Sequence, residues 1–491
     1  MGGLVCATIL AKEGKRVCIL EKNKQVGGSL QIFVRDKLIF DSGVHYIGGL
    51  EKGQNLYQVF KYLGIMDKLR LKKMDEDAFD KIVISGDDKV YVQAQGYDNF
   101  VKRLAVDFPG EEENLQRYCD KLRDTCNKFP LYNLDLAGSL NDKFAIMNES
   151  AKEVIESLIS DKKLQAVLAG NNLLYAGAGK RTPFYIHALI VNSCIESSWK
   201  CINGGSQIAK LLVEQIRKNG GTIFRNCEVK RIAERDGKVA FVETKDGQQI
   251  CADHFISNIS PVRTLELTDS PLIKEIYRNR VKGIDNTISC FSVHIVLKEN
   301  TVPYCNSNYY YHKEGYVWDV DDYTEEDWPR GYGVFFSPSS KNNDYAESMT
   351  LLCVMRYEDV KPWAHTFNTV SEENDRGEDY NSFKIRKAER VLDVASEKFP
   401  WLHDAVKKYY TTTPLSYRDY IGNEDGSMYG FAKDFNEPLK TMVSPRTKLP
   451  NLYLTGQNLN AHGILGTAVS GILTSILLLK NDKVVEKIKN A

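Results

Sequence analysis

The sequence predicts an α/β protein in which one parallel-sheet domain is assembled from separated segments of the chain. Helix and strand patterns beside glycines occur near the start, in the middle and at the end of the 491 residues. Such alternation of helix and strand is typical of parallel α/β units. The stretches between them combine amphipathic helical sequence with long β-rich runs. They predict an inserted α+β domain built on a mainly antiparallel sheet.

The composition is that of a folded protein without a charged macromolecular partner. The 65 Lys and Arg residues balance 65 Asp and Glu residues, so the formal net charge is zero. This balance argues against nucleic acid as a partner, because no long-range attraction to phosphate exists. The 11 cysteines are scattered and contain no CxxC pair. They predict reduced thiols, a cytoplasmic location and no metal site.

The first segment has the pattern of a dinucleotide-binding unit. The apolar run 4–12 predicts a buried helix that ends at Gly14, and residues 16–20 predict a short strand closed by Glu21. In such a unit an acid at this position accepts hydrogen bonds from a ribose hydroxyl. A surface glutamate after an ordinary helix–strand pair explains the same residues equally well.

Glycines surround this pattern. If Gly3 is the third glycine of G-x-G-x-x-G, the first two glycines and the strand before them precede Met1. Gly27-Gly28-Ser29 follow Glu21 and precede a β-rich stretch, an arrangement that lets backbone amides approach a pyrophosphate. A plain hairpin with a Gly-Gly turn is the alternative.

The middle segment repeats the alternation of helix and strand. Gly204-Gly205-Ser206 introduces a helix with Ser206 as its N-cap, which ends at Gly220-Gly221. Asp236-Gly237 and Asp246-Gly247 predict two consecutive hairpins. The expected strands are 222–224, 227–233 and 254–258.

The last segment combines a strand, 451–456, with the uncharged stretch 463–479. That stretch is shorter than the ~20 residues of a membrane-spanning helix and contains glycines. It therefore predicts a helix buried against a sheet. The N-terminal amides of this helix would face whatever lies beside Gly456, which suits an anion.

Together these segments resemble the phytoene desaturase, carotenoid isomerase and retinol saturase family of flavoproteins. Thr455-Gly456-Gln457-Asn458, Phe108 to Glu112 and Met428 to Phe431 are most similar to the retinol saturase branch. The resemblance covers nearly the whole chain. It implies an FAD-binding, Rossmann-like domain made of discontinuous segments, a lipophilic small-molecule substrate and frequent contact with a membrane surface. Because the net charge is zero, such peripheral membrane contact would depend on an apolar patch around the channel mouth.

The resemblance assigns domains and residues. Residues 1–72, 200–264 and 446–491 are expected to form the FAD-binding domain, and residues 73–199 and 265–445 the substrate-binding domain. The implied cofactor-binding residues are Gly2, Gly3, Glu21, Lys22, Gly27, Gly28, Ser29, Val229, Gly456, Gln457, Gly463, Ile464, Leu465 and Gly466. The first strand and first two glycines of the fingerprint are missing. Because every downstream flavin element is retained, a start codon placed too late is favoured over weak FAD binding.

The inserted regions are expected to carry the substrate. Residues 111–128 and 149–165 predict amphipathic helices, and 287–297 predicts a strand in a large sheet. The aromatic run Tyr309-Tyr310-Tyr311 and residues 333–336 and 349–355 continue that sheet. In the family such strands wall a lipophilic channel. An aromatic core in an antiparallel sheet is the alternative for any one residue.

The expected function is that of an FAD-dependent oxidoreductase acting on carbon–carbon double bonds of a retinoid-like or carotenoid-like polyene, with saturation favoured. His45, Tyr429 and His462 are the candidate proton donors, because each lies beside a flavin-associated motif. His187 and His294 lie in apolar sequence and are expected to be packed in the core.

Two other functions stay open from the sequence. One is a redox-neutral, FAD-dependent carotenoid cis–trans isomerase, or a desaturase. The other is a flavin-free binder of prenyl or lipid groups, similar to the Rab GDP-dissociation inhibitors. No second G-x-G-x-x-G is present. Any NAD(P)H is therefore expected to bind transiently as reductant, or to be replaced by another electron donor.

Overall fold

The computed structural model describes residues 1–137, 144–370 and 374–491, and its first segment folds as expected. Helix α1 (Gly2–Lys12) is buried over most of its length, and Gly14 follows it with φ at 79°. Strand β1 (Cys18–Leu20) then pairs in parallel with β9 (Thr222–Phe224) from the middle segment. Two segments separated by about 200 residues therefore form one parallel pair.

The middle segment begins with α9 (Ser206–Lys218). The prediction that Ser206 is the N-cap is wrong: Gly205 is the N-cap, and Ser206 is the first helical residue. The Asp41 carboxylate accepts a hydrogen bond of 2.7 Å from the Gly205 N–H. A carboxylate distant in sequence therefore fixes the start of this helix.

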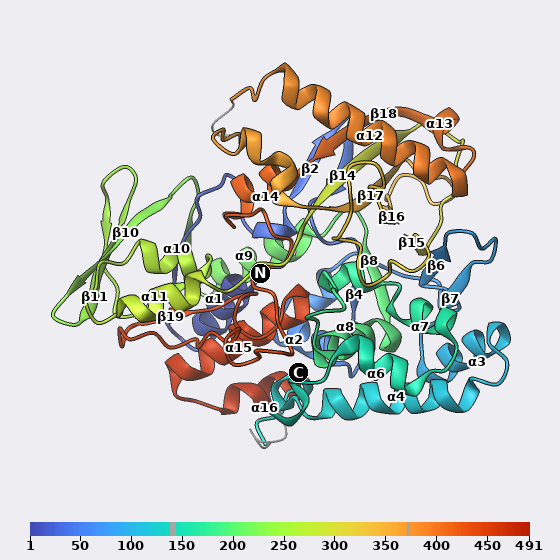
Figure 1. Ribbon diagram of the computed structural model, residues 1–491. Coiled ribbons are helices and arrows are strands. Elements are labelled where there is room, and N and C mark those ends of the chain that lie inside the picture. Colours follow the sequence, from blue (N-terminus) through green and yellow to red (C-terminus); the bar gives the residue numbers. More distant parts are fainter. Residues whose placement is uncertain (138–143, 371–373) are drawn as a thin grey trace.

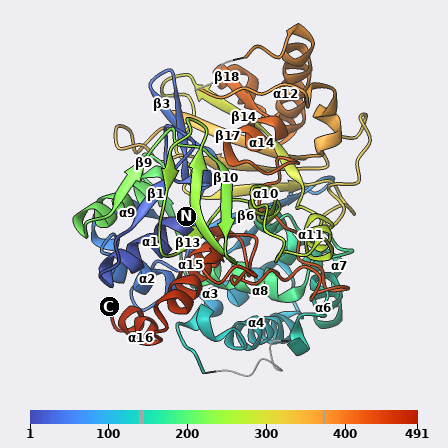
Figure 2. The same ribbon diagram turned by 90° about the vertical axis from the view of Figure 1, so that its left-hand side faces the viewer.

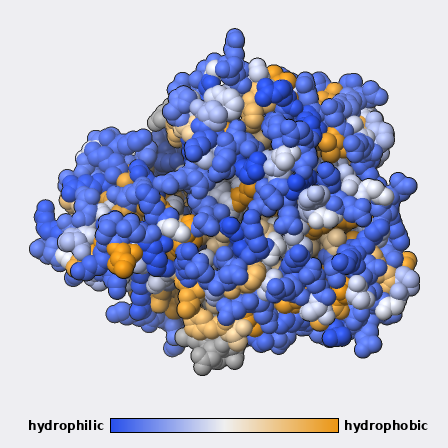
Figure 3. Space-filling view, in the orientation of Figure 1, coloured by the Kyte–Doolittle hydropathy of each residue, from blue (hydrophilic) through white to orange (hydrophobic). Residues whose placement is uncertain are grey.

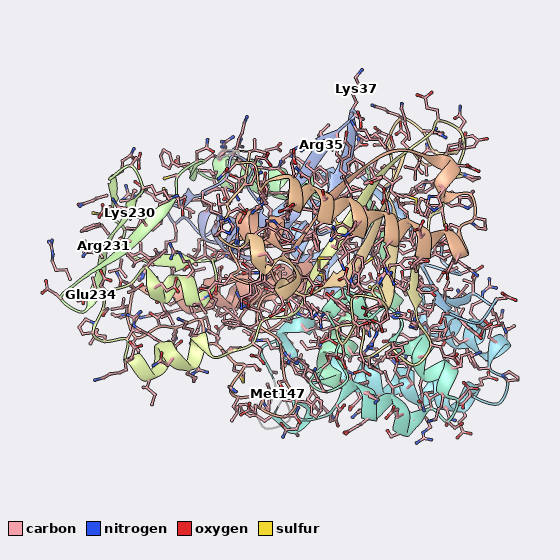
Figure 4. The ribbon with its side chains drawn as sticks, turned by 45° about the horizontal axis from the view of Figure 1, so that its top comes forward. Arg35, Lys37, Met147, Lys230, Arg231 and Glu234 are labelled. Carbon is pink, nitrogen blue, oxygen red and sulfur yellow. The ribbon has the colours of Figure 1, made fainter. Side chains whose placement is uncertain are left out.

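Two hairpins follow, as predicted. Strands β10 (Val229–Arg235), β11 (Lys238–Thr244) and β12 (Gln249–Ile250) form a three-stranded sheet. Asp236 and Gly237 both have positive φ, at 53° and 76°, which the tight turn between β10 and β11 requires. Figure 4 shows Lys230, Arg231 and Glu234 along the outer strand β10. It also shows Arg35 and Lys37 on the projecting hairpin of β2 (Ile32–Arg35) and β3 (Leu38–Asp41).

The last segment completes the part of the molecule that the first and middle segments form. Strand β19 (Leu452–Leu454) pairs in parallel with β13 (Phe255–Ser257), and α15 (Gly463–Leu479) follows. Helix α15 packs against α1, as the prediction of a buried helix required, and Figure 2 shows the two helices close to β1 and β13. The pairs β1–β9 and β13–β19 are two separate sheets.

A seven-stranded sheet forms the other side, in the order β18-β14-β17-β16-β15-β6-β7. Only β15 and β6 run parallel to each other, so the predicted mainly antiparallel sheet is confirmed. The strands are β6 (Asp80–Ile84), β7 (Tyr91–Gln93), β14 (Ser289–Leu297), β15 (Asn308–His312), β16 (Gly331–Phe336), β17 (Ser348–Met355) and β18 (Val406–Thr412).

Helices cover both faces of this sheet, and alternate residues of each strand point to opposite cores. Tyr310 packs with the helices below the sheet in Figure 1, whereas Tyr311 packs on the side of α12 (Glu378–Lys398). The helices below are α3 (Tyr97–Asp107), α4 (Glu112–Asn127), α6 (Ala151–Leu158), α7 (Lys162–Ala169) and α8 (Phe184–Glu196). Further helices are α2 (Asn55–Leu63), α10 (Pro261–Glu266), α11 (Glu275–Lys282), α13 (Leu402–Ala405), α14 (Pro414–Ile421) and α16 (Lys483–Lys489).

One expected helix is divided in two. The stretch 149–165 folds as α6 and α7 instead of one continuous helix. The Glu111 carboxylate accepts hydrogen bonds from the Ser160 hydroxyl and the Asp161 N–H, and the Asp161 side chain caps α7. Glu111 is the N-cap of α4, and its hydrogen bonds therefore keep the residues between α6 and α7 from forming a helix.

Two of the expected domain boundaries fall within a single small sheet. Strands β4 (Ile47–Gly48), β8 (Ser198–Cys201) and β5 (Leu71–Lys73) pair in the order β4-β8-β5. The boundaries at 72/73 and 199/200 lie inside β5 and β8. These strands connect the two expected domains, and the division itself stays a prediction.

The face of the molecule shown in Figure 3 is mainly hydrophilic, with small hydrophobic groups between the polar residues. Within the described ranges, none of the helices combines the length and the apolar character that crossing a membrane requires.

The contact between α1 and α15 depends on a glycine. A Cβ atom on Gly471 would lie 2.7 Å from the Gly2 carbonyl oxygen and 3.1 Å from the Cys6 nitrogen. We expect Gly471→Ala to lower the free energy of unfolding by about 1–3 kcal/mol, despite the helix propensity of alanine. Chemical denaturation measures this change. Gly283→Ala, at an exposed helix end with φ at −84°, is the control and should change it by less than about 1 kcal/mol. Equal values for the two variants would contradict the close contact.

Candidate active site

A cavity of about 1510 Å³ extends through the region where the separated segments meet. Its wall includes residues of β10, α1, α15 and α8, which follow one another from left to right in Figure 1, and residues of the seven-stranded sheet, which lies above α8 in that view. A single small-molecule site usually measures roughly 300–1,000 Å³. This cavity is therefore large enough for a cofactor and a second molecule. Every predicted cofactor residue lies in its wall, and so do His45, Tyr429 and His462.

One end of the cavity contains the residues predicted for the nucleotide. Glu21 follows β1, and its carboxylate accepts a 2.9 Å hydrogen bond from the Asn23 N–H. Burial raises the pKa of Glu21, and the Asn23 N–H opposes that rise. Lys22 donates from Nζ to the Asp419 carbonyl oxygen at 3.0 Å, so it fastens this loop to α14. Val229 begins β10, where the ladder has an irregular register.

The second glycine loop leaves space for a ligand. Gly27 and Gly28 have positive φ, at 122° and 58°. A Cβ atom on Gly27 would lie 2.8 Å from the Ala209 Cβ, whereas a Cβ atom on Gly28 would have no neighbour within 4 Å. Ser29 continues the loop in a short 3-10 turn, Gly28–Leu30. Side chains are therefore excluded at Gly27 by packing, and Gly28 leaves open space in the cavity wall.

Asn258 joins the three segments beside this loop. Its Oδ1 atom accepts a 2.9 Å hydrogen bond from the Gly3 N–H. A Cβ atom on Gly456 would lie 2.8 Å from the same oxygen, and one on Gly2 would lie 3.0 Å from the Gly456 Cα. The sequence did not identify Asn258 as a site residue. Its position directly after β13 was the available signal, because ligands bind beyond the carboxyl ends of parallel strands.

The first turn of α15 faces the cavity with Gly463, Ile464, Leu465 and Gly466. A Cβ atom on Gly463 would have no neighbour within 4 Å, so the approach to these backbone amides is open. The partial positive charge of a helix N-terminus favours an anionic or polarised ligand oxygen. Open glycine loops, this helix end and Glu21 together fit a dinucleotide that carries a pyrophosphate and a ribose.

Two of the candidate proton donors lie together. The rings of Tyr429 and His462 stack with their centroids 4.5 Å apart. The Tyr429 hydroxyl donates to the Leu173 carbonyl oxygen at 3.2 Å, so its proton is already engaged. His462 Nε2 has no hydrogen-bond partner among the described residues. Burial, together with a smaller contribution from the charge of Lys433, lowers the pKa of His462 to about 3.

His45 lies in another part of the wall. Its ring stacks on Phe335 with the centroids 4.2 Å apart. Burial lowers the pKa of His45 to about 4, with a contribution from the charge of Lys200. Both His45 and His462 are therefore neutral near pH 7, in a form that gives up a proton poorly.

The two histidines expected in the core are confirmed there. His187 is buried between the hydroxyl groups of Tyr118 and Tyr175, at 2.7 and 2.8 Å. The buried His294 contacts Thr350 and Thr412.

The inner part of the cavity is apolar. Its aliphatic and aromatic wall residues include Leu173, Leu174, Leu189, Ile190, Phe335 and Leu352. Of the run Tyr309-Tyr310-Tyr311, only Tyr310 lies in the wall. Tyr311 packs in the core on the other face of the sheet, as the alternative expectation held. This wall suits a lipophilic molecule.

The sequence matches a family of flavoproteins. The sequence model of the family described as flavin containing amine oxidoreductase matches residues 1–475. The chain belongs to the flavin-containing amine oxidoreductase family. It is an FAD-dependent oxidoreductase, and the cofactor expected from the sequence is confirmed at that level.

Relatives of this flavoenzyme confirm the expected family branch. All-trans-retinol 13,14-reductase of Macaca fascicularis is 28% identical over 527 residues, covering 98% of this chain and 84% of that protein. The Homo sapiens protein of the same name is 26% identical with the same coverage. Prolycopene isomerase 2, chloroplastic, of an Oncidium hybrid cultivar is 24% identical, covering 96% of this chain and 81% of that protein.

Solved structures confirm the predicted fold class of this flavoenzyme. An oxidoreductase from Methanosarcina mazei has a TM-score of 0.64 at 16% identity, covering 98% of both chains. Wild-type putrescine oxidase bound to putrescine has a TM-score of 0.63 at 13% identity, covering 98% of this chain and 97% of that chain. At these identities the likeness concerns the fold alone.

The position of Glu21 gives a binding prediction. We expect Glu21→Ala to weaken FAD binding about 10- to 100-fold, because a charged hydrogen-bond acceptor for the ribose is lost. Titration of the FAD-free protein, followed by quenching of flavin fluorescence, measures the dissociation constant. Glu214→Ala, on the exposed face of α9, is the matched control and should leave it unchanged. An unchanged dissociation constant in Glu21→Ala would remove this residue from the site.

Proposed function

We propose that this flavoenzyme acts on carbon–carbon double bonds of a lipophilic polyene of the retinoid or carotenoid kind, and that it saturates one of them. The observation that carries the proposal is the continuity of the cavity. The residues that fit FAD and the apolar wall formed by α8 and the large sheet belong to one space. A long apolar molecule in that space would reach the flavin end. The names of the retinol reductase and prolycopene isomerase relatives support the same substrate class.

FAD supplies the hydride transfer when it is bound. The chain itself has three tasks. The apolar wall orients the polyene and keeps water away from it, and a side chain provides the proton that the second alkene carbon requires. These tasks need few polar groups, which agrees with the apolar character of the inner cavity.

A second candidate is redox-neutral isomerisation of a polyene in the presence of reduced FAD. The likeness to prolycopene isomerases favours it as the alternative. Membership of the flavin-containing family supports an enzyme over the flavin-free lipid binder.

Product analysis tests the choice between these functions. The flavin-reconstituted protein is reduced without oxygen and incubated with all-trans-retinol or a cis-carotenoid. We expect a product heavier by two hydrogen atoms, together with stoichiometric reoxidation of the flavin, because hydride and proton add across one double bond. Incubations with oxidised flavin are the control. A product of unchanged mass formed without flavin reoxidation would establish the isomerase instead, and no turnover of either compound would reject the proposed substrate class.

We propose further that a nicotinamide, NAD(P)H, reduces the flavin through a transient encounter. The sequence contains no second dinucleotide fingerprint, so nothing in it indicates a dedicated binding site for a nicotinamide. On anaerobic mixing, the rate of flavin bleaching should rise linearly with NADPH concentration without saturation. Dithionite provides the reference for full reduction. Saturation at low NADPH concentration would instead indicate a dedicated site, and no bleaching would require a different electron donor.

The lipophilic substrate also supports peripheral contact with a membrane surface at the cavity mouth. Like the cytoplasmic location and the lack of a nucleic acid partner, this contact stays a prediction.

A further inference from the structure

A hydrogen-bonded chain of three side chains leads from the cavity wall into the protein. The hydroxyl oxygens of Tyr310 and Tyr46 lie 2.9 Å apart, and the Tyr46 hydroxyl donates to Asp80 Oδ2 at 2.7 Å. A protonated Asp80 would instead donate to the Tyr46 oxygen. Tyr46 and Tyr310 line the cavity, whereas Asp80 lies behind them and is fully buried. The chain therefore connects the apolar part of the cavity to a carboxyl group that the rest of the site does not use.

The fold brings these residues together from distant parts of the sequence. Asp80 begins β6, and the parallel pairing of β6 with β15 places Tyr310 beside Ile82, two residues further along. Tyr46 reaches the pair from the loop that precedes β4. The Tyr310 ring contacts Phe335 edge-on, with the centroids 5.9 Å apart, so the chain meets the cavity at its apolar wall.

The surroundings of Asp80 allow it to carry a proton. Asn308 donates to Oδ1 at 3.0 Å and Asn171 donates to Oδ2 at 3.4 Å. Burial raises the pKa of Asp80 to about 6, opposed by these hydrogen bonds and by the charge of Lys200 on β8. The other titratable groups that act on this cluster are the two tyrosines themselves, Tyr429 and the Cys194 thiol of α8. An acid that gains and loses a proton near neutral pH is suited to proton transfer.

We propose that Tyr310 donates the proton to the polyene, and that Tyr46 and Asp80 resupply it. The inference rests on the proposed function. Reduced FAD, when bound, would supply a hydride with its electron pair to one alkene carbon and would be oxidised by that loss. The electron pair of the π bond forms the second C–H bond with the Tyr310 hydroxyl proton. The Tyr46 proton passes to Tyr310 and the Asp80 proton passes to Tyr46, which leaves a carboxylate that water protonates again.

Other groups in the wall are less suited to this role. The Tyr429 hydroxyl donates its proton to the Leu173 carbonyl oxygen, and that hydroxyl has no hydrogen bond to an acid among the described residues. His45 and His462 are held neutral by burial. A charge on either imidazole would face an apolar cavity without a carboxylate partner, which is costly. Tyr46 and Tyr310 are wall residues whose hydroxyl groups connect to the buried Asp80, and Tyr310 ends this chain at the apolar wall, beside Phe335.

The first test removes the donor. In single turnovers of the pre-reduced holoenzyme with all-trans-retinol, Tyr310→Phe should form saturated product about 100-fold or more slowly than wild type. The affinities for FAD and for retinol, measured by fluorescence quenching, should stay unchanged. Tyr311→Phe is the matched control, because its ring lies on the same strand but packs on the opposite face of the sheet. It should behave as wild type.

The second test addresses the positioning residues Tyr46 and Asp80 without turnover. Ionisation of Asp80 changes the hydrogen bond of the Tyr46 hydroxyl, so the FAD-free protein should show a near-ultraviolet tyrosine difference signal between about pH 4 and pH 8. Asp80→Asn and Tyr46→Phe should abolish this signal, and Tyr311→Phe should retain it. In the holoenzyme, the single-turnover rate of wild type should fall as the pH rises above about 6, because Asp80 loses its proton. Asp80→Asn should be slow at every pH.

The outcomes separate the two proposals. If wild type forms saturated product and Tyr310→Phe forms it equally fast, the assignment of Tyr310 as the proton donor is wrong and the proposed function stands. If wild type binds retinol but forms no saturated product, the proposed function fails and the proton-delivery step fails with it. Retention of the tyrosine signal in Asp80→Asn would overturn the resupply of the proton from Asp80.

Discussion

The flavin side of this protein depends on one close contact among three segments that are far apart in the chain. Asn258 accepts a hydrogen bond from the Gly3 backbone, 255 residues away, and lies against Gly456. Next to this point, Gly471 brings α15 against the backbone of α1. Because the three segments carry different parts of the predicted cofactor site, their separation by even one methyl group would displace those parts relative to one another. Packing of glycines thus sets the geometry of the cavity.

Local sequence patterns were sufficient for much of this side of the fold. The uncharged stretch 463–479 is α15 with the same bounds, and the Asp-Gly pairs at 236–237 and 246–247 are the two hairpin turns. These elements follow from short-range chemistry: apolar helix composition, glycine at positive φ and β-rich flanks. The fourteen cofactor residues came from a resemblance, and all of them line one cavity. Composition or periodicity would not have selected them.

The predictions failed where distant side chains decide local structure. A serine beside a glycine pair usually caps a helix, but Asp41 holds Gly205, and Ser206 enters the helix. The amphipathic stretch 149–165 is interrupted because Glu111 binds the backbone at Asp161. The Tyr310–Tyr46–Asp80 chain is the strongest case. Tyr46 is 264 residues from Tyr310 and 34 from Asp80; the pairing of β6 with β15 brings Asp80 and Tyr310 together, and the loop before β4 adds Tyr46.

Burial has opposite effects on the histidines of the cavity wall and on the carboxyl group that lies behind it. Loss of water disfavours the charged form of every ionisable group. For an imidazole the charged form is the acid, so burial takes the proton away from His45 and His462. For a carboxyl group the neutral form is the acid, so burial raises the pKa of Asp80 to about 6, and a fraction of the carboxyl groups still carries a proton near neutral pH. An enzyme that holds a lipophilic substrate in a dry cavity can therefore store a proton on a buried carboxyl group at little electrostatic cost. Histidine at the same place would need a carboxylate partner to stay charged, and that second charge would itself have to be buried.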